Sequence, residues 1–142
     1  MEDFVSFEIA KKLKEKGFTL GYNLYGYKPI YTDVNTIVSI WNSGAYKKDY
    51  FGENIPCPTI SQALKWLRKE KKIHIPVLVI TDCSKDADNN ICEEWSFWSF
   101  SVTNLNDSST VYDDFEKIDC IEYQSYEEAA LAGIKYVLDN LI

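Results

Sequence analysis

Four basic residues between positions 64 and 72 are best placed, by type and spacing, to bind an anion. Lys65, Arg68, Lys69 and Lys72 recur at intervals of one to three residues, and at about 100° per residue they share one face of a helix. Such a row of cations can hold phosphate groups, and binding of this kind weakens steeply with salt. An ordinary solvated helix face has the same composition, and we favour that interpretation because the formal net charge is −7.

Aromatic residues are the second set that could bind a partner. Trp66 lies in the same stretch, on the flank beside the apolar side of the helix rather than among the cations. Trp66, Trp41 and Tyr46 are candidate exposed anchors, because Trp and Tyr dominate the energetics of protein interfaces. Aromatic residues make up 15% of the chain, which suits a core and an interface equally.

Motifs for catalysis or cofactor binding are not recognisable. There is no GxxxxGK[ST] phosphate loop and no GxSxG elbow. The single histidine, His74, has no nucleophile near it in sequence, and the carboxylate pair Asp113–Asp114 falls in a predicted loop. We therefore predict no catalytic residue and no cofactor, and we rank an enzyme of unfamiliar type below a binding protein.

Metal binding is equally weakly indicated. The segment beginning at Asp86 starts like a calcium loop, but Ile91 and Phe97 stand where an EF-hand needs Gly and Glu. A polar hairpin turn explains the same residues. The four cysteines form no CxxC pair, so no zinc site is predicted, and each is expected to be a buried small apolar residue.

The elements that must position these residues are three helices and several strands. Apolar periodicity predicts helices at 4–16, 59–72 and 125–142, with capping boxes led by Thr59 and Ser125. Strands are predicted at 74–82, 93–103 and 117–124, the first two as an antiparallel hairpin, with one or two weaker strands in 19–58. Because 74–82 is apolar on both faces, it is expected to be covered on both. The fold predicted is α+β, a three-layer α/β/α sandwich with a mainly antiparallel sheet, in a single domain over 1–142.

Composition bounds the location and the partners. The N-terminus does not resemble a signal peptide, and no apolar run is long enough to cross a bilayer, so a cytoplasmic protein without membrane contact is predicted. Residues 1–72 carry 12 basic and 8 acidic side chains, whereas residues 73–142 carry 3 and 14. The opposite charges of the two halves are expected to interact within the molecule, between subunits of a homo-oligomer, or with a partner at a binding face.

Three segments carry a resemblance that covers nearly the whole chain: "FVSFEIAKKLKEKGF", "CPTISQALKWLRKEKKIHI" and "SYEEAALAGIKYVLDNLI". They resemble uncharacterised small proteins of prophages and mobile elements of Bacteroidetes-type bacteria. The layout is similar to the phage ABA (α-β-α) sandwich domain. The resemblance implies a mobile-element accessory protein and supplies no activity and no catalytic residue.

These observations predict a non-catalytic module that binds an unknown protein. A nucleic-acid-associated regulator using the basic helix face is the alternative. A further variant has the acidic run 113–128 imitate DNA.

Overall fold

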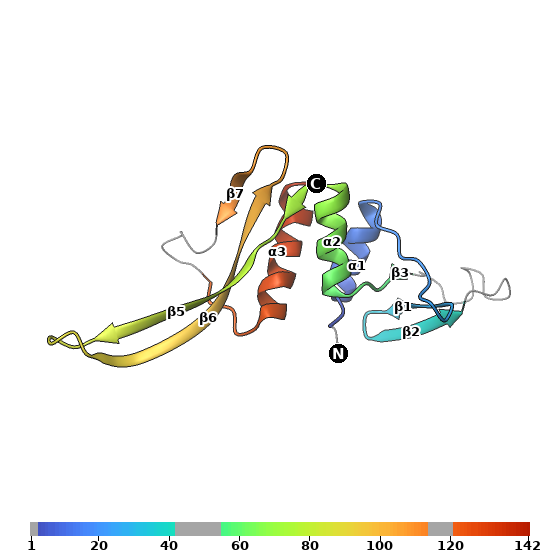
Figure 1. Ribbon diagram of the computed structural model, residues 1–142. Coiled ribbons are helices and arrows are strands. Elements are labelled where there is room, and N and C mark those ends of the chain that lie inside the picture. Colours follow the sequence, from blue (N-terminus) through green and yellow to red (C-terminus); the bar gives the residue numbers. More distant parts are fainter. Residues whose placement is uncertain (1–2, 42–54, 114–120) are drawn as a thin grey trace.

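The computed structural model describes residues 3–41, 55–113 and 121–142 and shows an α+β protein, as predicted (Figure 1). The elements in chain order are α1 (Phe7–Glu15), β1 (Tyr27–Asp33), β2 (Thr36–Trp41), β3 (Ile55–Pro56), α2 (Ile60–Glu70), β4 (Ile73–His74), β5 (Val77–Lys85), β6 (Ile91–Asn104), β7 (Ser109–Asp113) and α3 (Tyr126–Asn140).

The described strands form two separate antiparallel sheets. One has the order β2-β1-β3, and the other has the order β4-β6-β5 with β7 also paired to β6. The three helices lie between the sheets, with α3 packed on β6 and β5, and α1 beside β3 (Figure 1). The predicted sandwich, in which helices cover both faces of one sheet, is therefore not confirmed. Among the described residues, β1, β2 and β3 pair with one another and not with the hairpin.

Helix ends follow the local sequence closely. The Thr59 side chain accepts a hydrogen bond from the Gln62 amide, and the Gln62 side chain accepts one from the Thr59 amide, which completes the predicted capping box. After α1, Gly17 adopts a left-handed φ of 97°, and the Phe18 amide donates to the Leu13 carbonyl in a Schellman motif. At α3 the predicted box forms only in part, because the Glu128 carboxylate accepts from the Gln124 amide instead of the Ser125 amide.

Replacing the α2 cap should have a measurable cost. Thr59→Ala leaves the Gln62 amide without its side-chain acceptor, so we expect the free energy of unfolding to fall by about 1 kcal/mol. Urea denaturation followed by circular dichroism measures this difference. Ser61→Ala, an exposed change in the same helical turn, is the control and should stay within about 0.5 kcal/mol of wild type. An equal loss from both variants would contradict the capping role.

The core lies where α3 meets β6 and the other two helices. The buried residues of α3 are Ala129, Ala130, Gly133, Ile134, Val137 and Leu138. They face buried residues of the other elements, among them Leu13, Leu67, Phe100 and Val102. Gly133 allows close contact, because a Cβ built there would lie 2.6 Å from Ile75 Cγ2 and 3.1 Å from Phe100 Cδ2. The buried residues of α3 thus form its core face.

Two strand predictions differ from the structure. The strand after β6 is β7, which the sequence did not indicate. Of the predicted strand 117–124, residues 117–120 lie outside the described residues and 121–124 form no strand. Tyr123, at its end, forms an isolated antiparallel bridge with Trp98. The hairpin of β5 and β6 is confirmed, but the prediction that β5 is covered on both faces is wrong, since Leu78 and Val79 are 56% and 55% exposed.

Candidate interaction surface

The predicted basic face exists on α2. Lys65, Arg68 and Lys69 are exposed along the helix, and Lys72 is exposed just beyond its end. Lys72 has a φ of 56°, which marks the point where the chain leaves the helix. None of the four forms an ion pair with another residue in 3–41, 55–113 or 121–142, where the observed ion pairs all involve Lys12. We call these four residues the basic face.

Trp66 is not a freely exposed anchor. Its side chain is half-buried and packs against the core, with its ring edge-on to Phe18 at a centroid distance of 5.6 Å. The Lys71 Nζ lies 5.4 Å from the ring centroid, within cation–π range. The ring packs inward because Phe18, three residues after the end of α1, lies against it. The side chain of Trp41 and all of Tyr46 lie outside the described residues.

A hollow of about 230 Å³ opens between α2 and the segment 18–20, next to the basic face. Apolar side chains of Phe18, Leu20 and Trp66 contribute to its wall, and Lys65 and Lys69 border it. The complete lining is Phe18, Thr19, Leu20, Gln62, Lys65, Trp66, Lys69 and Glu70. The hollow thus combines an apolar interior with a mainly cationic border.

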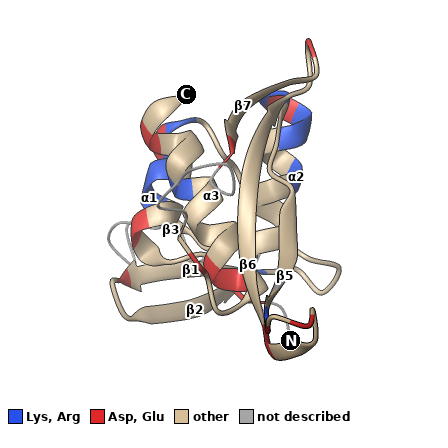
Figure 2. Ribbon diagram, turned by 90° about the vertical axis from the view of Figure 1, so that its left-hand side faces the viewer, with Lys and Arg blue, Asp and Glu red and all other residues tan. Residues whose placement is uncertain are grey.

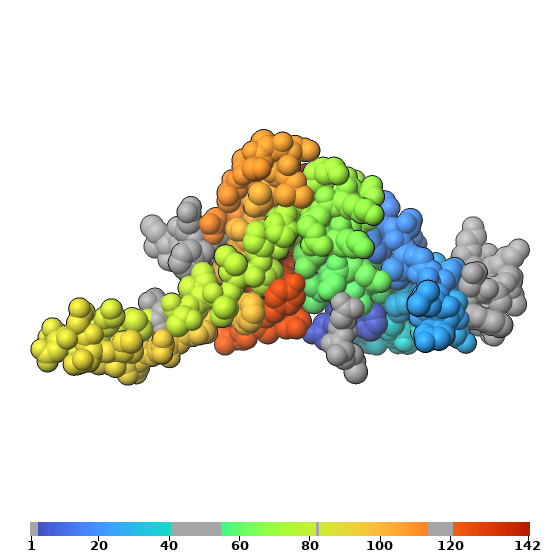
Figure 3. Space-filling model, in the orientation of Figure 1, coloured from blue at the N-terminus to red at the C-terminus, as the bar shows by residue number. Residues whose placement is uncertain are grey.

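The hairpin of β5 and β6 extends beyond the helices as an arm, which we define as residues 78–96 (Figures 1 and 3). The arm extends beyond the helices because β6 is longer than α3. The 14 residues of β6 span about 46 Å, whereas the 15 residues of α3 span about 22 Å. Tyr126, the first residue of α3, meets the Trp98 ring edge-on at 5.8 Å, and the strands continue past this contact toward their turn.

The arm carries exposed apolar side chains. Leu78 and Val79 on β5 are 56% and 55% exposed, and Ile91 and Trp95 on β6 are 59% and 41% exposed. Leu78 and Val79 are consecutive on β5 and therefore point to opposite faces, so the arm exposes apolar groups on both faces. The sequence signal was the apolar character of both faces of β5, which we interpreted as burial within the molecule.

The turn at the end of the arm is built by Asp86. Its Oδ1 accepts hydrogen bonds from the amides of Asp88 and Asn90, each at 2.9 Å, and Asn89 has a φ of 68°. The bond from the Asn90 amide is the main reason that the pKa of Asp86 lies below its usual value. The segment that resembled a calcium loop is therefore the hairpin turn, with this carboxylate oriented toward its own backbone. Within the described ranges, His, Cys, Asp and Glu side chains do not gather in any group of three that could hold a metal ion.

Two other predicted residue types are placed by the structure. His74 is half-buried in β4 opposite Thr103, and its Nδ1 is buried without a hydrogen-bond partner among the residues described. Cys57 is fully buried and Cys83 partly so, but Cys92 is exposed on the arm. The expectation that each cysteine is buried is therefore wrong for Cys92. This residue lies near the turn of the arm, in the part of β6 that extends beyond the helices.

Comparison with protein-family models, with curated proteins and with solved structures finds no match. In the part of the chain that the structure describes, no helix has the length and apolar character needed to cross a membrane.

Proposed function

We propose that this protein is a non-catalytic protein-binding module and that the arm is its contact surface. One observation carries the proposal: Leu78, Val79 and Trp95 are between 41% and 56% exposed on a hairpin that projects away from the helices. Apolar groups displayed on a projecting strand pair gain free energy when a partner removes them from water, at about 25 cal/mol per Å². Strands of this kind are a recurrent means of recognition.

The remaining features of the proposal come from the sequence. The resemblance to prophage and mobile-element proteins supports an accessory role of that type, and the cytoplasmic location predicted from the sequence is part of the same proposal. For the three-layer arrangement we propose a changed form, in which one layer of helices supports a sheet on each side. In this form the larger sheet is free to extend the arm beyond the helix layer.

Nucleic-acid binding is the second candidate, and it has its own observation. The basic face presents Lys65, Arg68 and Lys69 to solvent without an ion-pair partner among the described residues. If this face binds phosphates, duplex DNA binding should weaken steeply with salt and should be lost on Arg68→Glu with Lys69→Glu. Unchanged DNA affinity in that variant would exclude this candidate.

Site-specific photo-crosslinking in the cells that naturally produce the protein tests the binding module. A photoreactive amino acid at Ser96, exposed on the arm, should give an adduct of defined mass, and Trp95→Ser should remove it. The same amino acid at Lys11, exposed on α1, is the control and should not give that adduct. An adduct pattern that is the same from both positions, or no adduct from Ser96, would overturn the assignment of the arm.

A further inference from the structure

We infer that the partner of the arm is a second copy of this chain. In this inference, which rests on the proposed function, Trp95 of one copy occupies the hollow beside α2 of the next. Three features of the described residues lead to it: the opposite charges of the two surfaces, the size of the hollow and the direction of the arm.

The charges of the two surfaces are complementary. Between positions 83 and 96 the arm carries one basic and four acidic residues: Lys85, Asp86, Asp88, Glu93 and Glu94. The hollow is bordered by Lys65 and Lys69, and Arg68 is exposed on the same helix. Figure 2 shows the basic residues on α2 and the acidic residues at the end of the hairpin. Opposite charges of this kind steer association and select the partner surface.

The hollow has the size of a side chain. At about 230 Å³ it is smaller than the roughly 300–1,000 Å³ typical of small-molecule sites, and Phe18, Leu20 and Trp66 give it an apolar interior. Trp95 is the largest of the exposed apolar side chains of the arm. Glu93 lies two residues away and therefore on the same face of β6. With Trp95 in the hollow, Glu93 faces the lysines at its border.

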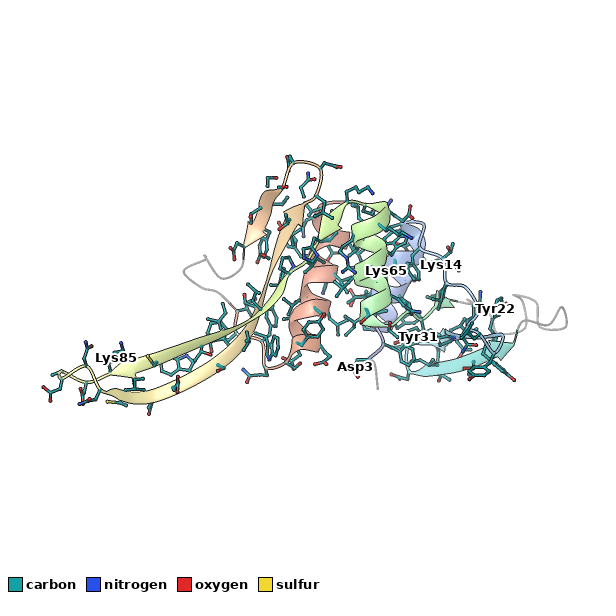
Figure 4. The ribbon with its side chains drawn as sticks, in the orientation of Figure 1. Asp3, Lys14, Tyr22, Tyr31, Lys65 and Lys85 are labelled. Carbon is teal, nitrogen blue, oxygen red and sulfur yellow. The ribbon has the colours of Figure 1, made fainter. Side chains whose placement is uncertain are left out.

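The direction of the arm requires a second molecule. Figure 4 places Lys85 near the far end of the arm and Lys65 on α2 in the body, and the arm points away from α2. When the arm and the hollow of one chain engage different neighbours, the contact is head-to-tail and repeats into a ring or an open chain. Direct pairing of two arms would bring two acidic surfaces together, and this disfavours the symmetric alternative.

Sedimentation of the purified full chain tests the inference. At about 0.05 M salt the protein should form species larger than a monomer, and about 0.5 M salt should weaken their association at least tenfold. Glu93→Lys or Trp95→Ser should weaken it at least tenfold. Glu94→Lys makes the same charge change on the opposite face of the arm and should have a much smaller effect. A protein that is monomeric at low salt, or an equal loss from Glu93→Lys and Glu94→Lys, overturns the inference.

Mixing two defective chains distinguishes this contact from a symmetric one. A chain with Lys65→Glu and Lys69→Glu keeps its arm, and a chain with Glu93→Lys and Trp95→Ser keeps its hollow. Each alone should be monomeric, and the mixture should form dimers containing one copy of each. Lys11→Glu with Lys14→Glu, on α1, is the control and should assemble like wild type. If the mixture remains monomeric, or if Lys65→Glu with Lys69→Glu assembles normally, the inference is overturned. An adduct between the arm and a different protein in cells would then still support the proposed function.

Discussion

Gly133→Val should lower the free energy of unfolding by about 3 kcal/mol, the upper part of the range for overpacking a core. A Cβ at this position would already lie 2.6 Å from Ile75 Cγ2, and valine adds two further methyl groups. Ile75 and Phe100 are both 4% exposed, so neither has free space into which it can move. Urea denaturation measures the loss, and Lys135→Val, on the exposed face of α3, should cost only a few tenths of a kcal/mol.

A double-mutant cycle identifies the atom responsible. Gly133→Ala should destabilise wild type by about 1 kcal/mol, because overpacking outweighs the helix propensity that alanine gains. In an Ile75→Ala background the contacted methyl group is gone, so the same substitution should cost less than half as much. An equal cost in both backgrounds would show that Ile75 is not the obstacle.

The helices could be predicted because their signals are local. Thr59 and Gln62 are three residues apart, and Gly17 follows the C-cap residue of α1. Each interaction is complete within one turn of chain, so the sequence alone contains it. The first helix nevertheless begins at Phe7 with Ser6 as its N-cap, rather than at the predicted Phe4. Phe4 instead forms a bridge with Thr59, which depends on residues far away in sequence.

The sheets could not be predicted to the same extent, because strand pairing is not local. The hairpin of β5 and β6 was recognisable, since its turn is short and polar. The pairing of β1 with β3 joins residues that are far apart in sequence, such as Ile30 and Pro56. No hydrophobic periodicity in the sequence indicates which strands pair. The same limit explains why two sheets were taken for one.

The candidate surface was predicted in part. The basic face follows from helical periodicity alone, and the structure places Lys65, Arg68 and Lys69 on one exposed side of α2. The hollow depends on Phe18 and Leu20, which precede the start of α2 by forty residues or more, so no local pattern indicated it.

The arm was missed for a different reason. Two apolar faces on a strand show that both are to be kept from water, but they do not show whether a helix or another molecule covers them. Although α3 packs on β5, Leu78 and Val79 remain 56% and 55% exposed. The incorrect prediction about β5 is therefore itself an argument for a partner.

Alkaline pH should destabilise the protein through two buried groups that touch each other. Burial is the main reason that the pKa of Cys57 rises from 9.0 to about 11, and burial likewise raises the pKa of Tyr31, beside which the Cys57 thiol lies. The Tyr31 hydroxyl also donates a hydrogen bond to the Val5 carbonyl. A raised pKa means that the folded state holds the proton more tightly than the unfolded state. The resulting stability is complete below about pH 9 and is lost as the pH rises through about 11.

For Cys57 alone the expected loss between these pH values is about 2 to 3 kcal/mol, from about 1.4 kcal/mol for each unit of pKa change. Urea denaturation at both pH values, with a reductant present, measures it. The loss should be smaller in Cys57→Ala, and smaller in Tyr31→Phe, whatever each substitution costs at neutral pH. Cys92→Ala, at an exposed cysteine, is the control and should lose as much as wild type. If Cys57→Ala also loses as much as wild type, the buried thiol is not the source of the alkaline sensitivity.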